Sequence, residues 1–320
     1  MSASVPAMAW PAARGCTGIM TDNIVSSNQI HSATTSYMDP VVVLGGAGKT
    51  GRRIAARLGA RGVPVRPASR STAVRFDWTD RSTWTPALTG ARAAYIAYHP
   101  DLAAPGSDEA IAELTATARR AGVGRLVLLS GRGEPGAQRC EEIALASGPA
   151  TTVVRCSWFA QNFSEDFLAD EIAAGRVALP AAAVTEPFVD ADDIADVVVA
   201  ALAEDGHAGR IYELTGPRSL TFAEAVATIA DATGRDIDYL PVSLSDYTAA
   251  MTEMGVPDEI AGSLTYLFET VLDGRNSATA DGVEQALGRA PAAFEDYALR
   301  AADAGSWPVA EDEVAGSVQR

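Results

Sequence analysis

Short apolar runs alternate with segments of helical periodicity along the central part of the chain. The first run, 41–44, enters a glycine-dense turn, and apolar residues then recur at Ile54, Ala55 and Leu58, as on one face of a helix. Because strands that alternate with helices form parallel sheets, this pattern predicts an α/β fold with a doubly wound Rossmann sheet. The later runs that predict strands occupy 64–70, 74–78, 93–100, 125–130 and 150–155.

The two ends of the chain differ from this central part. Residues 1–39 are rich in Ser, Ala, Thr and Asn and lack a hydrophobic period, so we expect a disordered N-terminal extension. Beyond 175 the pattern becomes a mixture of short strands and helices, which predicts a smaller, mainly helical portion that binds substrate. The expected division is a Rossmann domain over 40–175 and 186–215, a substrate-binding portion over 176–185 and 216–308, and a tail over 309–320.

Within the substrate-binding portion, Thr221 followed by Glu224 predicts a capping box at the start of a helix over 221–233. These elements would roof the carboxyl edge of the sheet and shape a pocket. Further helices are expected at 245–254, 258–272 and 291–302, and strands at 210–214 and 236–242.

Composition and charge exclude several classes of function. The 320 residues carry a formal net charge of −16, which argues against nucleic acid as a partner because a phosphate backbone attracts a basic surface. The sequence has no uninterrupted apolar stretch of ~18 residues, so we expect no membrane span. The three cysteines form neither a C-x-x-C motif nor a cluster with histidine, which fits a reducing cytoplasm. We expect a cytoplasmic monomer or homodimer that binds a small molecule.

The turn after the first strand matches a dinucleotide-binding motif. Gly46, Gly48 and Gly51 fit G-x-G-x-x-G, in which the glycines allow a tight turn, close approach to a pyrophosphate and packing of helix on strand. The pyrophosphate would lie at the helix N-terminus, where unpaired N–H groups point outward. The cofactor-binding residues expected here are Gly46, Ala47, Gly48, Lys49, Thr50 and Gly51.

The end of the second strand predicts which dinucleotide is preferred. An acidic side chain there binds the ribose 2′-OH of NAD, whereas an arginine accommodates the 2′-phosphate of NADP. This chain has Ser69 and Arg70 and no acid. A guanidinium forms strong, bidentate bonds to phosphate, so the sequence predicts NADP(H).

Further candidates follow the next strands. Asp77 and Trp78 are expected to flank the adenine ring, although Asp77 could instead cap the helix expected near 82–88. Tyr98 and His99 end the strand at 93–100, and ligands of open α/β sheets bind beyond such strand ends. His99 could donate a proton near neutral pH, or it could simply pack before a proline.

Ser130 ends the strand at 125–130 and is a third candidate catalytic residue, beside Tyr98 and His99. The strand at 150–155 leads into a segment rich in aromatic and amide side chains, which predicts a mostly apolar pocket with a few polar groups that orient a ligand. The helical spacing of Phe159, Phe163 and Phe167 would also suit a plain core face. The expected substrate-binding residues are Trp158, Phe159, Gln161 and Asn162.

Several segments together resemble the NmrA-like atypical short-chain dehydrogenases/reductases. The similarity spans roughly 40–307. The run from Trp158 to Phe163, with Leu287-Gly288-Arg289 and Phe294, is most similar to the branch that contains the ergot-alkaloid-type dehydrogenases. The segments that carry the resemblance are Gly46–Gly51, Ser130-Gly131, Val154-Arg155, Trp158–Phe163, Phe188–Ala195 and Tyr212–Pro217.

This resemblance implies a reductase that uses NADPH on an apolar small molecule, an imine, an activated alkene or a quinone, in secondary metabolism. Classical members of the superfamily follow the serine with Tyr-x-x-x-Lys, but no tyrosine lies between Tyr98 and Tyr212 and Lys49 is the only lysine. Two alternatives stay open. Other NmrA-like proteins sense the dinucleotide without turnover, and an isomerase or cyclase without net redox is also compatible.

The acidic residues Asp190, Asp192 and Asp193 are not interpreted as a metal site. They precede the apolar period of Ile194 and Val197, and acids in a first turn complement a helix dipole.

Overall fold

The computed structural model describes residues 39–181 and 183–308. The expectations for the segment before 39 and for the tail lie outside the described residues. A central sheet of seven strands has the order β3-β2-β1-β4-β5-β6-β9, and every pair of neighbours is parallel, as expected for a doubly wound fold. Its strands are β1 (Val41–Leu44), β2 (Val65–Ser69), β3 (Val74–Arg75), β4 (Ala93–Ile96), β5 (Arg125–Gly131), β6 (Ala150–Cys156) and β9 (Ile211–Leu214).

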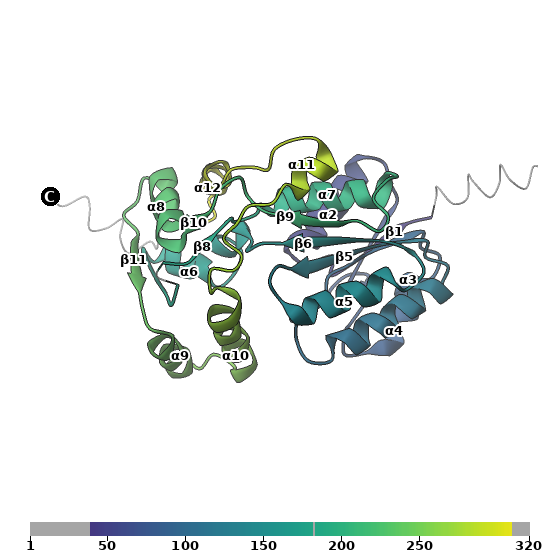
Figure 1. Ribbon diagram of the computed structural model, residues 1–320, viewed down its shortest axis with the longest axis horizontal. Helices are drawn as coiled ribbons and strands as arrows, with labels where there is room; N and C mark the ends of the chain where they lie inside the picture. The colour runs from purple at the N-terminus through teal and green to yellow at the C-terminus, as the bar shows by residue number, and fades with distance from the viewer. Residues whose placement is uncertain (1–38, 182, 309–320) are drawn as a thin grey trace, which may run out of the picture. The chain divides into compact units, whose positions relative to one another are not determined.

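Helices cover both faces of this sheet (Figure 1). Along β1, Val42 and Leu44 share one core with Leu114, whereas Val41 and Val43 share the other core with the residues of the opposite helices. A strand buried on both faces reads as a continuous apolar run, which explains why the pattern predicted it. One face carries α2 (Lys49–Ala60), α7 (Ala191–Ala203) and α11 (Gly282–Leu287); the other carries α3 (Trp84–Leu88), α4 (Ser107–Arg120) and α5 (Pro135–Leu145).

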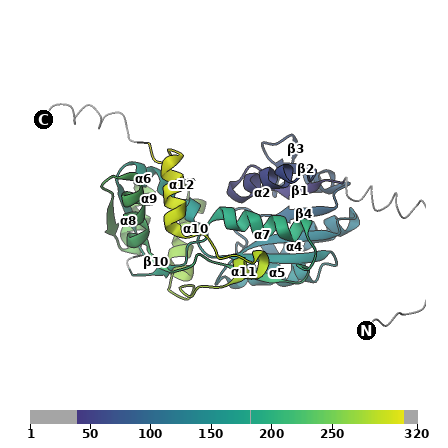
Figure 2. The same cartoon turned by 90° about the horizontal axis from the view of Figure 1, so that it is seen from above.

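A second lobe contains the remaining helices and two small sheets, which gather at one end of the molecule in Figure 2. The expected capping box of Thr221 and Glu224 is present at the start of α8. The elements of this lobe are α6 (Leu168–Ala173), α8 (Phe222–Thr233), α9 (Leu244–Glu253), α10 (Asp258–Tyr266), α12 (Phe294–Asp303), the pair β7 (Arg176–Leu179) and β11 (Asp238–Pro241), and the pair β8 (Thr185–Glu186) and β10 (Leu220–Thr221).

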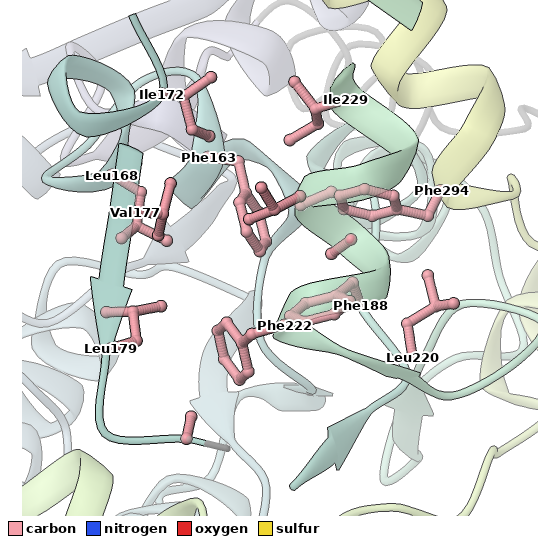
Figure 3. Close-up of a cluster of buried hydrophobic side chains, with 14 of the residues drawn as sticks. Phe163, Leu168, Ile172, Val177, Leu179, Phe188, Leu220, Phe222, Ile229 and Phe294 are labelled. Carbon is pink, nitrogen blue, oxygen red and sulfur yellow. The ribbon is translucent and has the colours of Figure 1, made fainter. Parts of the chain in front are cut away.

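The core of the second lobe is built around aromatic rings that point toward one another (Figure 3). The Phe163 ring lies 5.2 Å from Phe188 and 5.4 Å from Phe294, measured between centroids, and both contacts are edge-to-face. Leu168 and Ile172 belong to the same core. The segment 160–173 therefore packs in the second lobe, earlier in the chain than the change of pattern near 175.

Local structure departs from the expected helices in three places. The segment with Phe159, Phe163 and Phe167 forms only a short 3₁₀ helix, Ala160–Phe163, so these rings do not line one helical face. The helix expected over 258–272 ends at Tyr266 and continues as a π-helical turn, Leu267–Val271. Helix α11 was not expected; a β-carbon at its Gly282 would lie 2.8 Å from the Glu213 nitrogen, so a glycine lets it approach β9.

The acidic cluster at the start of α7 joins elements of the fold. Asp190 caps the helix by accepting a hydrogen bond from the Asp192 amide at 2.8 Å, and it accepts a second from Gln161 Nε2 at 2.7 Å. Asp193 pairs with Arg289 at 2.6 Å. These contacts account for the acids through packing and capping. Within 39–181 and 183–308, no helix is long and apolar enough to cross a bilayer.

Candidate functional site

A cavity of about 1060 Å³ lies at the carboxyl ends of the central strands. Residues that follow β1, β2, β4, β5 and β6 line it on one side, as expected for ligand sites of open α/β sheets. The second lobe closes it with apolar side chains from α10 and the π-helical turn: Ile260, Leu264, Leu267 and Val271.

The glycines of the loop after β1 differ in their surroundings. Gly48 is exposed on the cavity wall, beside Gly45, whose φ of +77° requires a glycine. Gly51 is buried in α2, and a β-carbon there would overlap the Gly45 carbonyl oxygen and lie 2.8 Å from its carbon. A β-carbon at Gly46 would lie 2.7 Å from the Pro67 side chain. Gly46 and Gly51 therefore allow close packing of helix and loop, and Gly48 leaves its backbone exposed in the cavity wall.

The start of α2 fits a phosphate group. Gly48 is its N-cap and supplies no side-chain acceptor, and the first turn contains no acidic residue. The first amides of the helix are thus left for a ligand oxygen, and the helix dipole favours an anion there. Thr50, another expected contact, also lies in the lining. Its hydroxyl is 2.8 Å from the Tyr95 hydroxyl, and Thr50 as a residue is 95 % buried.

The residues expected to bind the adenosine half line the same cavity: Ser69, Arg70, Asp77 and Trp78. Arg70 is exposed at the end of β2. The pKa of the Asp77 carboxyl is lowered, first by the Thr79 hydroxyl and amide and also by the charges of Arg75 and Arg70. Asp80, and not Asp77, caps the 3₁₀ turn before α3, because its side chain accepts from the Ser82 amide.

Tyr98 and His99 follow β4 and also line the cavity. The Tyr98 ring packs on Trp78 with centroids 4.7 Å apart, and the Trp78 indole donates to the Ala97 carbonyl at 3.1 Å. Burial raises the Tyr98 pKa above its ordinary value of 10. His99 is exposed.

Ser130 lies in the cavity wall, but its hydroxyl is engaged behind it. It donates to Glu141 Oε1 at 2.5 Å, and Glu141 is ion-paired with Arg155. Glu141 is 98 % buried, so this pair is a buried salt bridge that also reaches Glu213 through Arg155 at 2.6 Å. Ser130 is thus connected, through Glu141 of α5, to a buried ion-pair network.

The expected substrate residues separate into two groups. Trp158, Phe159 and Asn162 line the cavity. Gln161 does not belong with them: it is 97 % buried, its amide nitrogen donates to Asp190, and its amide oxygen accepts from the Ala191 amide at 2.7 Å. Both polar atoms of Gln161 serve the N-terminus of α7, so its assignment as a substrate residue is corrected.

Charged side chains tie the glycine loop to the second lobe. The Lys49 ammonium donates to Asn162 Oδ1 at 2.7 Å and pairs with Asp166. Arg53, one turn further along α2, pairs with Glu165 at 2.6 Å. Lys49 lines the cavity, and its ammonium group is already ion-paired with Asp166 of the second lobe.

Sequence reasoning missed two buried carboxyl groups in the cavity, those of Glu134 and Glu186. Among the described residues, Oε1 of each has no hydrogen-bond partner, and neither has the indole nitrogen of Trp158. Burial and the negative charge of Asp101 raise the Glu134 pKa to about 8, and burial raises that of Glu186 to about 7. The sequence holds one indication of Glu134: it lies in the short glycine-containing segment that follows the carboxyl end of β5, where ligands of open α/β sheets bind.

Comparison with known proteins gives relatives along nearly the whole described chain, although no family model matches it. The chain is 31 % identical over 280 residues to the uncharacterized oxidoreductase YesF of Bacillus subtilis, which covers 84 % of this chain and 96 % of YesF. It is 28 % identical over 283 residues to festuclavine dehydrogenase easG of Aspergillus fumigatus, covering 81 % and 96 % of the two chains.

A solved structure has the same fold. The NADPH complex of the quinone oxidoreductase QOR2 from Escherichia coli superposes with a TM-score of 0.69 at 20 % sequence identity, and the match covers 81 % of this chain and 99 % of QOR2. At this identity, the similarity establishes a shared fold.

Proposed function

This chain belongs to the NmrA-like family of atypical short-chain dehydrogenases/reductases, and we propose that it uses NADPH to reduce an apolar small molecule. Its relatives establish it as an NAD(P)H-dependent oxidoreductase. The proposed use of NADPH on an apolar substrate rests on one cavity, which extends from the glycine loop to an apolar wall of the second lobe.

The preference for NADPH rests on the end of β2. Arg70 is exposed on the cavity wall, where a guanidinium can form charge-assisted bonds to a 2′-phosphate. No acidic residue stands at 69 or 70 to bind a ribose 2′-OH in its place. The solved QOR2 structure of the same fold holds NADPH, which supports this choice.

The substrate half of the cavity is mainly apolar. Trp158 and Phe159 line it together with the side chains of Leu264, Leu267 and Val271. Such a wall favours a flat, apolar acceptor and disfavours a sugar or a small acid. We propose an imine, an activated alkene or a quinone, each of which is reduced by one hydride and one proton.

The protein residues bind, orient and shield these reactants. When bound, the cofactor supplies hydride, and the chain supplies position and exclusion of water. The uncapped N-terminus of α2 would hold the pyrophosphate, and Arg70 the 2′-phosphate. Tyr98 and Trp78 also line the cavity, and their rings contact each other in a tilted arrangement.

The test is consumption of NADPH by the purified full chain with a panel of quinones, cyclic imines and enones. Stoichiometric oxidation of NADPH with formation of one reduced product class would support the reductase. Tight binding of NADPH without turnover on any acceptor would contradict it and favour a sensor. Conversion of an acceptor without consumption of NADPH would instead identify a non-redox catalyst.

A further inference from the structure

The cavity contains polar groups that the fold itself leaves unsatisfied. Glu134 Oε1, Glu186 Oε1 and Trp158 Nε1 are all buried in its wall without a hydrogen-bond partner in the described part of the chain. Buried polar groups are nearly always paired, because leaving one unpaired costs free energy. Their convergence on one cavity indicates that a ligand completes these contacts.

Glu134 has the least compensated carboxyl group of the cavity. It lies at the N-cap of α5, is 95 % buried, and forms no side-chain hydrogen bond or ion pair within 39–181 and 183–308. Its second oxygen lies against Gly131, where a β-carbon would overlap it and approach the carboxyl carbon to 3.2 Å. The glycine at the tip of β5 therefore makes room for this carboxyl group at the carboxyl end of the sheet.

The charged and titratable neighbours of Glu134 favour its neutral form. Burial raises its pKa, the negative charge of Asp101 in the loop after β4 raises it further, and the Tyr266 hydroxyl group of α10 interacts with it electrostatically. Arg132 and Arg275 are near in the chain or in space, but their guanidinium groups are bound to the Ala278 carbonyl at 2.9 Å and to Asp273 at 2.6 Å. A carboxyl group in this setting keeps its proton at neutral pH.

We propose that Glu134 is the acid that supplies the proton when this enzyme reduces its substrate. The proposal rests on the proposed function. Hydride adds to one atom of the C=N, C=C or quinone system, and the electron pair of the broken π bond moves to the other end of that system. That end takes the proton from the Glu134 carboxyl group, whose O–H bond breaks to leave a carboxylate. Water then returns a proton to Glu134 after the product leaves.

Other groups in the lining are less suited to this step. Burial raises the pKa of Tyr98 above 10, so it is a weaker acid than Glu134 at neutral pH. The Ser130 hydroxyl is donated to Glu141. Glu186 is a buried carboxyl group like Glu134, but it accepts a hydrogen bond from the Trp158 backbone amide and faces the positive charge of Arg132, and both favour its ionised form.

The first test compares turnover of Glu134→Gln with that of the wild type, on whichever acceptor the wild type reduces. The amide keeps the shape and a hydrogen-bond donor but has no proton to transfer, so we expect kcat to fall by about 10²–10⁴-fold with unchanged affinity for NADPH. The wild-type rate should decline as pH rises through about 8, because Glu134 then loses its proton, and this decline should be absent in the variant.

Glu142→Gln removes one carboxylate from the exposed side of the same helix and should leave kcat unchanged. A Glu134→Gln variant with wild-type kcat, or with the wild-type pH profile, overturns the proposal even though the enzyme is a reductase. A wild type that reduces no acceptor refutes the proposed function itself, and the proton-donor role with it.

The second test requires no enzymatic activity, and it does not depend on correct folding of Glu134→Gln. The infrared carbonyl band of a protonated carboxyl group is followed against pH in the wild type and in Glu186→Gln, where the band that remains is assigned to Glu134. We expect that band to persist at pH 7 and to disappear as pH rises through about 8. Its absence at pH 7 would show that Glu134 is already ionised and would overturn the proposal.

Discussion

The packing of α2 on the glycine loop can be tested with one substitution at two positions of the same helix. Gly51→Ala adds a methyl group that would overlap the Gly45 carbonyl oxygen and lie 2.9 Å from Gly46 Cα. Gly59→Ala adds the same methyl group eight residues later in α2, where nothing lies within 4 Å of it. The two variants have the same composition and differ only in what the methyl group meets.

The expected effects have opposite signs. Alanine at 59 should raise the free energy of unfolding by about 0.5–1 kcal/mol, because it restricts the unfolded chain and favours the helix. Alanine at 51 should lower it by about 1–3 kcal/mol, the usual cost of overpacking, since its neighbours are backbone atoms that cannot rotate away. Displacement of the helix should also move its N-terminal amides away from the phosphate, so the affinity for NADPH should fall in Gly51→Ala alone.

Urea unfolding followed by circular dichroism gives both free energies, and calorimetric titration gives both affinities. The contrast between the variants should amount to about 1.5–4 kcal/mol. If Gly51→Ala is as stable as Gly59→Ala and binds NADPH equally well, the inference that α2 packs closely on the glycine loop at Gly51 is refuted.

Three further predictions concern charge. Arg70→Glu should weaken NADPH binding far more than NADH binding in calorimetric titrations, since it places a repulsive charge beside the 2′-phosphate; an equal loss of both would refute the role of Arg70. Arg155→Met should lower the free energy of unfolding by about 3–5 kcal/mol in urea, because it leaves the buried Glu141 carboxylate without its partner. Glu134 has a folded pKa near 8 against an ordinary 4.5, so its stabilising contribution is complete below pH 4.5 and lost as pH rises through 8. Compared with Glu134→Gln, the wild type should therefore lose up to about 4 kcal/mol between pH 5 and 8; equal slopes would contradict the raised pKa.

The strands of the central sheet could be predicted because their burial is recorded in short, continuous segments of the sequence. Strands such as β1 and β4 are buried at every position, and a continuous apolar run records this in the sequence. The capping box of Thr221 and Glu224 is also contained within four residues. By contrast, α11 has only six residues and forms because Gly282 can approach the backbone of Glu213. That contact joins distant parts of the chain, and no local pattern predicts it.

The same distinction explains the candidate site. The glycine loop and Arg70 follow from motif spacing; Gly48 and Arg70 line the cavity, whereas Gly46 and Gly51 are buried behind it. Gln161 was misassigned because its partners at the start of α7 are thirty residues away in the chain. Glu134 was missed because a glutamate after a strand usually lies in water, and only the folded structure shows that this one is buried without a partner.

Calorimetric titration of the full chain with NADPH and with NADH tests the central claim most directly. The account predicts one NADPH per chain, bound more tightly than NADH because of Arg70 and the uncapped start of α2. Absence of NADPH binding would contradict the interpretation of the glycine loop, on which the proposed reaction and the role of Glu134 both depend.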